Sequence, residues 1–171
     1  RVRTGRGGGA KCGLEGRGGS GRAVEISGLN EKVGGTEEEM FAAIKRFLSY
    51  LPSHHREAPP DAPVPAGSGA DMQNVFDILP EKRTQVYDMK RVIKALVDKD
   101  SMFELKPRFG KSATVSLARL GGKSVGIVAN NPLHRGGALD ADACRKIVDF
   151  LVLCDSFNIP TRVLVDTPGF H

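Results

Sequence analysis

Tryptophan is absent from this 171-residue chain, and cysteine and tyrosine are scarce, with three and two residues. The three cysteines (Cys12, Cys144 and Cys154) form no Cys-x-x-Cys pair, so the sequence favours neither a disulfide framework nor a zinc site. No run approaches the roughly 18 apolar residues that a membrane span needs, so no membrane contact is expected. The apolar fraction of 40% is nevertheless sufficient for a buried core.

Acidic residues are almost missing from residues 1–23, where Glu15 alone opposes six basic side chains. This segment therefore has a net charge of +5, which equals the net charge of the whole chain. The other basic and acidic residues number 19 each, so no basic face is predicted and no nucleic-acid partner is expected. Nine glycines make residues 1–23 a predicted disordered tail. An RNA-binding tail is the alternative, as is a segment foreign to the folded protein. The tail has neither an apolar run nor an amphipathic face, so we expect a cytoplasmic protein, or a matrix protein in a mitochondrion.

Helical periodicity begins after a capping box formed by Thr36 and Glu39. The spacing predicts a helix over residues 36–51, with one apolar stripe packed on a core and an end at Pro52. Residues 53–70 are rich in proline and are predicted to be a linker, in which His54 and His55 form a solvated pair rather than a metal site.

Strand-like patterns follow a short amphipathic helix predicted over residues 88–98. Residues 114–120 and 124–130 flank Gly121 and Gly122, a pattern typical of a β-hairpin. The second of these runs is almost continuously apolar, which predicts a strand that is covered on both faces.

A third helix is predicted over residues 140–157, with Asp140 as its N-cap. Its two apolar stripes predict cover from two sides, by its own core and by another subunit or domain. Residues 162–166 are predicted to be a buried strand. A strand–helix–strand unit of this length implies a parallel crossover.

Small residues stand directly before this helix, at Gly136, Gly137 and Ala138. Glycine lets the backbone approach a ligand closely, and the N–H groups at a helix start favour negative charge. The same residues are equally compatible with a simple turn. The chain contains neither a phosphate-binding nor a dinucleotide-binding glycine motif, and no Gly-x-Ser-x-Gly elbow that would favour a serine hydrolase.

The run from residue 121 to residue 170 resembles the carboxyltransferase subunit of biotin-dependent acyl-CoA carboxylases, especially β chains of propionyl-CoA carboxylase type. The matching words are VGIVAN, GGALDADA, CDSFNIP and DTPGF, and the upstream YDMKRVI resembles the lead-in to the same half of the family chain. The resemblance covers residues 71–170 and, more loosely, residues 26–51. Residues 1–23 carry no part of it.

The resemblance implies a mixed α/β fold, a crotonase-like repeat of β-β-α units. It divides the chain into the end of an N-terminal carboxyltransferase half (24–52), the linker (53–70) and a truncated C-terminal domain (71–171). It also implies transfer of a carboxyl group from carboxybiotin to the α-carbon of an acyl-CoA, with oxyanions stabilised by backbone N–H groups. No metal and no protein nucleophile would be needed. The residues expected to line or support the cleft are Gly136, Gly137, Ala138, Thr167, Pro168, Gly169 and Phe170.

The partners implied by the resemblance are an acyl-CoA, a biotin carboxyl carrier that brings biotin, a biotin carboxylase subunit and further copies of the same chain. The family chain is much longer, and the glycine motif that supplies its biotin-side donors is not found here, which predicts a fragment. Two alternatives remain open: the α-subunit of a biotin-dependent decarboxylase, and a catalytically inactive oligomerisation module.

Overall fold

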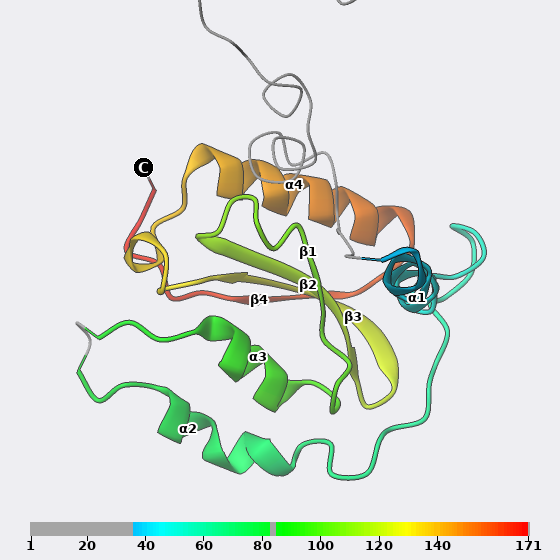
Figure 1. Ribbon diagram of the computed structural model, residues 1–171, viewed down its shortest axis with the longest axis horizontal. Coiled ribbons are helices and arrows are strands. Elements are labelled where there is room, and N and C mark those ends of the chain that lie inside the picture. The colour runs from blue at the N-terminus through cyan, green and yellow to red at the C-terminus, as the bar shows by residue number, and fades with distance from the viewer. Residues whose placement is uncertain (1–35, 83–84, 171) are drawn as a thin grey trace, which may run out of the picture.

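The computed structural model describes residues 36–82 and 85–170. A four-stranded sheet in the order β1-β2-β3-β4 lies at its centre, with α4 on one face and α2 and α3 on the other (Figure 1). The elements, in chain order, are α1 (Glu37–Leu48), the 3-10 helix η3 (Ala70–Asn74), α2 (Val75–Ile78), α3 (Met89–Leu96), β1 (Phe103–Leu105), β2 (Ala113–Leu120), β3 (Lys123–Asn130), the 3-10 helix η4 (Arg135–Gly137), α4 (Ala141–Ser156) and β4 (Thr161–Leu164).

The predicted hairpin is present as the antiparallel pair β2–β3. Gly121 and Gly122 form its turn with φ angles of 59° and 80°, a conformation that glycine adopts without steric cost. The carboxylate of Asp98 accepts hydrogen bonds from both turn N–H groups, at 3.0 and 2.7 Å. The chain just after α3 is thereby attached to the tip of the hairpin.

The predicted parallel crossover is also present, because β4 pairs with β3 in parallel after the chain has passed through α4. The α4 helix begins as predicted, with the Oδ1 atom of Asp140 accepting a hydrogen bond from the Ala143 N–H at 2.8 Å. Close packing of α4 on β3 depends on Gly126, where an added Cβ would lie only 2.6 Å from the Cys154 sulfur.

Two hydrophobic clusters lie on opposite faces of the sheet. On the α4 face, Phe150 packs with the β2 residues Val115 and Leu117. On the α3 face, Ile93 packs with Ala118 and Ile127 and is completely buried. Alternate residues of β2 therefore supply both clusters, as a strand between two helical layers requires.

The segment 162–166 is not a buried strand, contrary to the prediction. The observed strand β4 lies at the edge of the sheet, and Val163 and Val165 are 59% and 73% exposed. One face of α4 is likewise open, with Val148 58% exposed, while Phe150 on its other face is buried. An apolar run in the sequence predicts a surface that favours burial, but it does not show which element or partner buries that surface.

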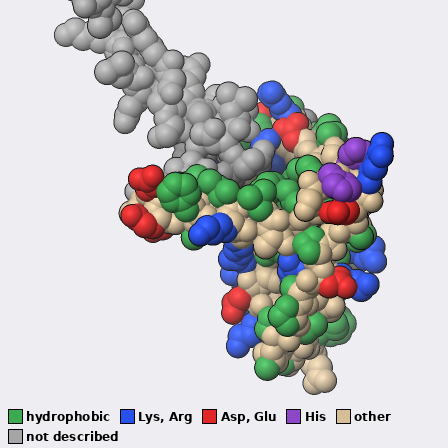
Figure 2. Space-filling model, turned by 90° about the vertical axis from the view of Figure 1, so that its right-hand side faces the viewer, with side chains coloured by type: hydrophobic (Ala, Val, Ile, Leu, Met, Phe, Trp, Pro, Cys, Tyr) green, Lys and Arg blue, Asp and Glu red, His purple; other side chains and the backbone are tan. Residues whose placement is uncertain are grey.

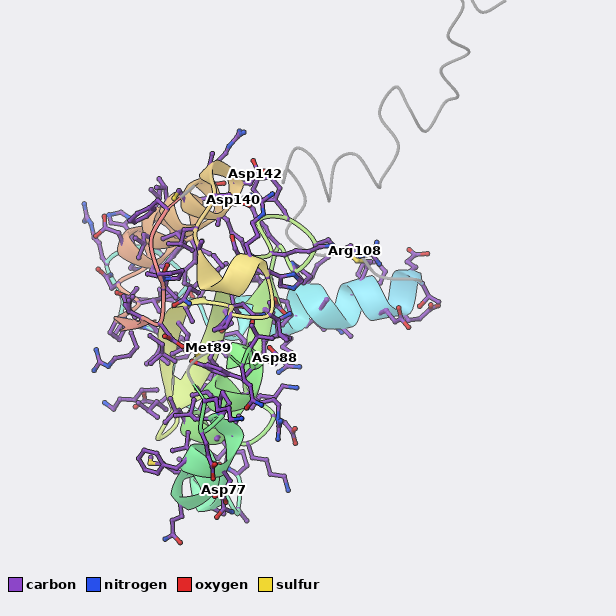
Figure 3. All side chains as sticks on the ribbon, turned by 90° about the vertical axis from the view of Figure 1, so that its left-hand side faces the viewer. Asp77, Asp88, Met89, Arg108, Asp140 and Asp142 are labelled. Carbon is purple, nitrogen blue, oxygen red and sulfur yellow. The ribbon has the colours of Figure 1, made fainter. Side chains whose placement is uncertain are left out.

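The helix α1 begins at its predicted cap, where the Glu39 N–H donates to the Thr36 hydroxyl at 3.2 Å. Its apolar stripe packs on the core only in part: Phe47 packs against the core cluster, whereas Phe41, Ile44 and Leu48 are about half exposed (55%, 46% and 57%). Figure 3 shows α1, in pale blue, extending away from the body of the protein, and Figure 2 shows a projecting arm with hydrophobic side chains on its surface and acidic side chains at its tip. Tyr50 and Leu51, which follow the helix, are buried in the same core cluster.

The predicted linker after α1 has no regular secondary structure up to η3, but it is attached to the sheet. The Ala62 N–H donates to the Gly122 carbonyl at 2.9 Å, and the Arg119 guanidinium donates to the Pro60 carbonyl at 2.8 Å. His54 and His55 are exposed, and the Nε2 atom of His54 lies 3.2 Å from a Glu57 carboxylate oxygen. Among the described residues, no helix is long and apolar enough to span a membrane.

Candidate functional site at the ends of β3 and β4

The two predicted cleft segments follow the two parallel strands of the sheet. Residues 136–138 come after β3, and residues 167–170 come after β4. Because β3 and β4 are parallel, their carboxyl ends lie at the same edge, the position where open α/β sheets bind ligands.

A backbone contact joins the two segments directly. The Leu139 N–H donates to the Gly169 carbonyl at 3.0 Å, and Leu139 and Phe170 form an isolated parallel bridge. The structure therefore brings together two stretches that the sequence resemblance assigned to one cleft. Their roles in that cleft stay a prediction.

The glycine loop is a left-handed turn, with φ angles of 54°, 62° and 86° at Arg135, Gly136 and Gly137. The Gly137 N–H donates to the His134 carbonyl at 3.0 Å, and the Ala138 N–H donates to the Arg135 carbonyl at 3.2 Å. These two donors are occupied within the turn itself. They shape the loop rather than present themselves to a ligand.

Gly136 differs from Gly137 in its surroundings. A Cβ added at Gly136 would meet nothing within 4 Å, and the residue is exposed. A Cβ added at the buried Gly137 would lie 2.7 Å from the Asn130 amide nitrogen and 2.9 Å from the Asp166 carbonyl oxygen. Gly136 thus faces open space, while Gly137 is enclosed by the strand ends.

The turn after β4 is closed by the side chain of Thr167. Its hydroxyl donates to the Gly169 carbonyl at 3.0 Å and accepts from the Gly169 N–H at 3.2 Å. Pro168 is exposed, and Phe170 is 76% exposed. A large apolar side chain therefore stands unburied beside the glycine loop.

Three residues that were not among the predicted cleft residues hold this edge together: Asn130, Asp166 and Tyr87. Asn130 accepts a hydrogen bond from the Asp166 N–H at 2.6 Å through Oδ1, and its Nδ2 donates to the Asp166 carbonyl. A polar residue at the end of an apolar strand is the signal that could have revealed Asn130.

Tyr87 joins the lead-in to α3 to the same edge, because its hydroxyl donates to the Asp166 carboxylate at 2.8 Å. Burial raises the pKa of Tyr87 to about 12, with smaller contributions from the hydrogen bond to Asp166 and from the negative charge of the Asp166 carboxylate. The phenol therefore stays protonated and acts as a donor at neutral pH.

The start of α4 is less available to an anion than the sequence suggested. Asp140 places its own carboxylate at the first turn, and a second Asp140 oxygen lies 3.4 Å from the Arg135 guanidinium. Figure 3 shows Asp140 and Asp142 together at this helix start, with Arg108 apart from them. Within the described residues, no group of three His, Cys, Asp or Glu side chains could hold a metal.

A hairpin followed by a parallel α-helical crossover, with a glycine loop and a turn side by side at the strand ends, defines a β-β-α unit of a mixed α/β fold. Comparison with known proteins extends this to the family level. The Carboxyl transferase domain matches residues 7–171, and the chain belongs to that family. The match begins inside residues 1–23, which the sequence resemblance had left out.

Curated relatives include a putative propionyl-CoA carboxylase beta chain of Bacillus subtilis, 37% identical over 95% of this chain and 31% of the relative. The propionyl-CoA carboxylase beta chain of Saccharopolyspora erythraea is also 37% identical, over 92% of this chain and 30% of the relative. The chain thus spans about a third of the length of these relatives. The predicted resemblance is confirmed.

Among solved structures, transcarboxylase 12S superimposes with a TM-score of 0.86 at 34% identity, over 92% of this chain and 30% of that chain. A single-chain, multi-domain long-chain acyl-CoA carboxylase gives a TM-score of 0.74, also at 34% identity, over 88% of this chain and 14% of that chain. The predicted fold class, a partial crotonase-like α/β domain, is confirmed.

Proposed function

We propose that this chain is part of a carboxyltransferase that moves a carboxyl group from carboxybiotin to the α-carbon of propionyl-CoA or a similar acyl-CoA. The observation that carries the proposal is the direct contact between the two family-matched segments, from the Leu139 N–H to the Gly169 carbonyl. Relatives of this chain are named biotin-dependent acetyl-/propionyl-coenzyme A carboxylase subunits and propionyl-CoA carboxylase beta chains.

The reaction places its demands on backbone groups rather than on a nucleophilic side chain. The α-carbon, having lost a proton, forms a bond to the carboxyl carbon while the bond from that carbon to nitrogen breaks. The electron pair of the broken bond would stay on the ureido group of biotin, whose nitrogen would take up the proton that the α-carbon has lost. Negative charge would develop on the thioester oxygen and on the ureido oxygen of biotin, and fixed N–H donors in a cleft stabilise both charges.

Biotin, carried by a partner protein or domain, would supply the carboxyl group. The residues that could meet it are those at the open side of the edge, Gly136 and Phe170. The exposed backbone at Gly136 allows close approach, and the exposed ring of Phe170 offers an apolar surface. The role of Gly137, Ala138 and the Thr167–Gly169 turn would be to hold Gly136 and Phe170 in place, since the hydrogen bonds of these supporting residues lie within the loop and the turn.

The domain boundaries belong to the same proposal: residues 24–52 end an N-terminal carboxyltransferase half, residues 53–70 link, and residues 71–171 begin a C-terminal domain. The partners would be an acyl-CoA, a biotin carboxyl carrier, a biotin carboxylase subunit and further copies of this chain, in the cytoplasm or, in a eukaryote, in the mitochondrial matrix. Support for a partner comes from the exposed apolar residues on α4 and β4, such as Val148 and Val163.

A catalytically inactive oligomerisation module is the second candidate, and it is favoured by the same exposed residues on α4 and β4. The two candidates differ in one readout. The complete protein that contains residues 36–170 is incubated with a carboxylated biotin carrier and propionyl-CoA, and carboxylated CoA product is measured by mass spectrometry. The proposal expects product that depends on both substrates. Stable oligomers with no product under these conditions would favour the inactive module.

A further inference from the structure

Asn130 is the residue at which the two cleft segments and the two strand ends meet. We propose that Asn130 is a positioning residue, whose amide sets the distance between the loop at Gly136 and the turn at Thr167–Phe170. The inference rests on the proposed function, because it assigns Asn130 a role in the same cleft. Asn130 itself is 5% exposed, so it would act through these segments rather than by touching a substrate.

The first step of the argument is the place of Asn130 in the sheet. The last paired residues of β3 and β4 are Ala129 and Leu164, and the strands separate after them. Beyond that point the Asn130 side chain takes over the pairing, accepting from the Asp166 N–H and donating to the Asp166 carbonyl. One amide thus satisfies both backbone groups of a residue two positions past the end of the ladder. Among side chains of this length, only a carboxamide supplies both an acceptor and a donor.

The second step is the contact with the glycine loop. A Cβ at Gly137 would lie 2.7 Å from the Asn130 Nδ2 and 2.9 Å from the Asp166 carbonyl oxygen. The loop backbone therefore rests directly on the hydrogen bond between these two residues. A shift of the Asn130 amide must displace either the loop or the segment that carries Asp166.

The third step connects this bond with the cleft. Thr167, which closes the turn, follows Asp166 directly, and the Leu139 N–H reaches across to the Gly169 carbonyl at 3.0 Å. If the strand ends move apart, residues 136 and 170 move apart with them. Displacement of reacting groups by about 1 Å can lower a rate about 100-fold, so a positioning role has a measurable kinetic consequence.

The test compares Asn130→Asp with Asn131→Asp in the complete protein. The aspartate at 130 keeps an acceptor for the Asp166 N–H, but it loses the donor and places an oxygen against the Asp166 carbonyl. Asn131 is a matched control because it is also buried, at 1% exposure. Its side chain accepts from the N–H groups of Met89 and Leu133 and donates to the Asp88 carboxylate at 3.5 Å, outside the contact between the two cleft segments.

We expect Asn130→Asp to lower kcat for carboxyl transfer 10- to 100-fold with less than a threefold change in KM for acyl-CoA. Asn131→Asp should lower the thermal midpoint but leave kcat per folded enzyme within threefold. An unchanged kcat in Asn130→Asp would overturn the inference, as would an equal loss in both variants at matched thermal midpoints.

A second variant, Asn130→Ser, removes the amide without adding a charge and serves if the aspartate variant does not fold. Amide hydrogen exchange should then be faster at residues 136–139 and 166–170 and unchanged at the hairpin turn of Gly121 and Gly122. Uniform exchange across the sheet would contradict a local role. This readout needs no activity, so it separates failure of the positioning role from failure of the proposed reaction.

Discussion

The two glycines of the loop should respond very differently to the same substitution. Gly137→Ala places a methyl group 2.7 Å from the Asn130 amide nitrogen and 2.9 Å from the Asp166 carbonyl oxygen, at a φ of 86°. Gly136→Ala meets no atom within 4 Å, at a φ of 62°.

The magnitudes follow from these surroundings. A left-handed conformation costs a residue with a Cβ about 1–2 kcal/mol, and this applies at both positions. Forced overlap in a packed region adds about 1–3 kcal/mol, and this applies only at Gly137. We therefore expect Gly137→Ala to lower the free energy of unfolding by about 2–5 kcal/mol and Gly136→Ala by about 1–2 kcal/mol. The larger loss is a substantial part of the roughly 5–15 kcal/mol that stabilises a typical domain.

The assay is urea unfolding of each variant followed by circular dichroism, with carboxyl transfer by the folded fraction measured on the same samples. If Gly136 borders the cleft, its variant should lose transfer activity beyond the small loss in stability. Equal unfolding free energies for the two variants would refute the packing argument. An unchanged transfer rate in folded Gly136→Ala would reduce the loop to a structural turn.

Three further predictions concern the support around the site. Asp98→Ala removes both hydrogen bonds to the hairpin turn and should lower the free energy of unfolding by about 2–4 kcal/mol; a chemical denaturation curve that matches the wild type would contradict this. Lys146, 1% exposed, donates to the carbonyls of Phe109 and Ala113. Lys146→Met should therefore leave two buried acceptors unmet and cost about 2–5 kcal/mol, whereas an unchanged thermal midpoint would show that the carbonyls find other donors. The pKa of Tyr87 is raised from 10.0 to about 12 in the folded protein. The protonated phenol therefore contributes fully to the free energy of unfolding below pH 10, and this contribution is lost as the pH rises towards 12. Tyr87→Phe should flatten that part of the stability profile, and parallel profiles for the two proteins would count against the Tyr87–Asp166 hydrogen bond.

Local chemistry made part of this fold predictable from the sequence. The hairpin rests on Gly121 and Gly122, and the start of α4 rests on Asp140, so each is specified within a few residues. The parallel crossover followed from the length of the unit between two apolar runs. Burial was predicted less well, because Val163 and Val148 have apolar side chains that no described element covers.

The candidate site was likewise predictable where it depends on local sequence and unpredictable where it depends on contacts between distant residues. The loop and the turn could be named from short motifs, and the structure brings them into contact through Leu139 and Gly169. The bonds that hold them there join residues far apart in the chain, as in Tyr87 with Asp166. No local pattern encodes such a pairing. The sequence also suggested that the N–H groups of Gly137 and Ala138 are available to a ligand. Only the structure shows that both groups are occupied by hydrogen bonds within the turn.

The central claim is that the loop at 136–138 and the turn at 167–170 form part of one carboxyltransferase cleft. Hydrogen exchange of the complete protein, measured by mass spectrometry with and without a biotinylated carrier and acyl-CoA, tests it most directly. The account predicts slower exchange in both segments when the substrates are added, with no change at the Gly121–Gly122 turn on the opposite end of β3. Protection confined to other parts of the protein, in an enzyme that still transfers the carboxyl group, would contradict it.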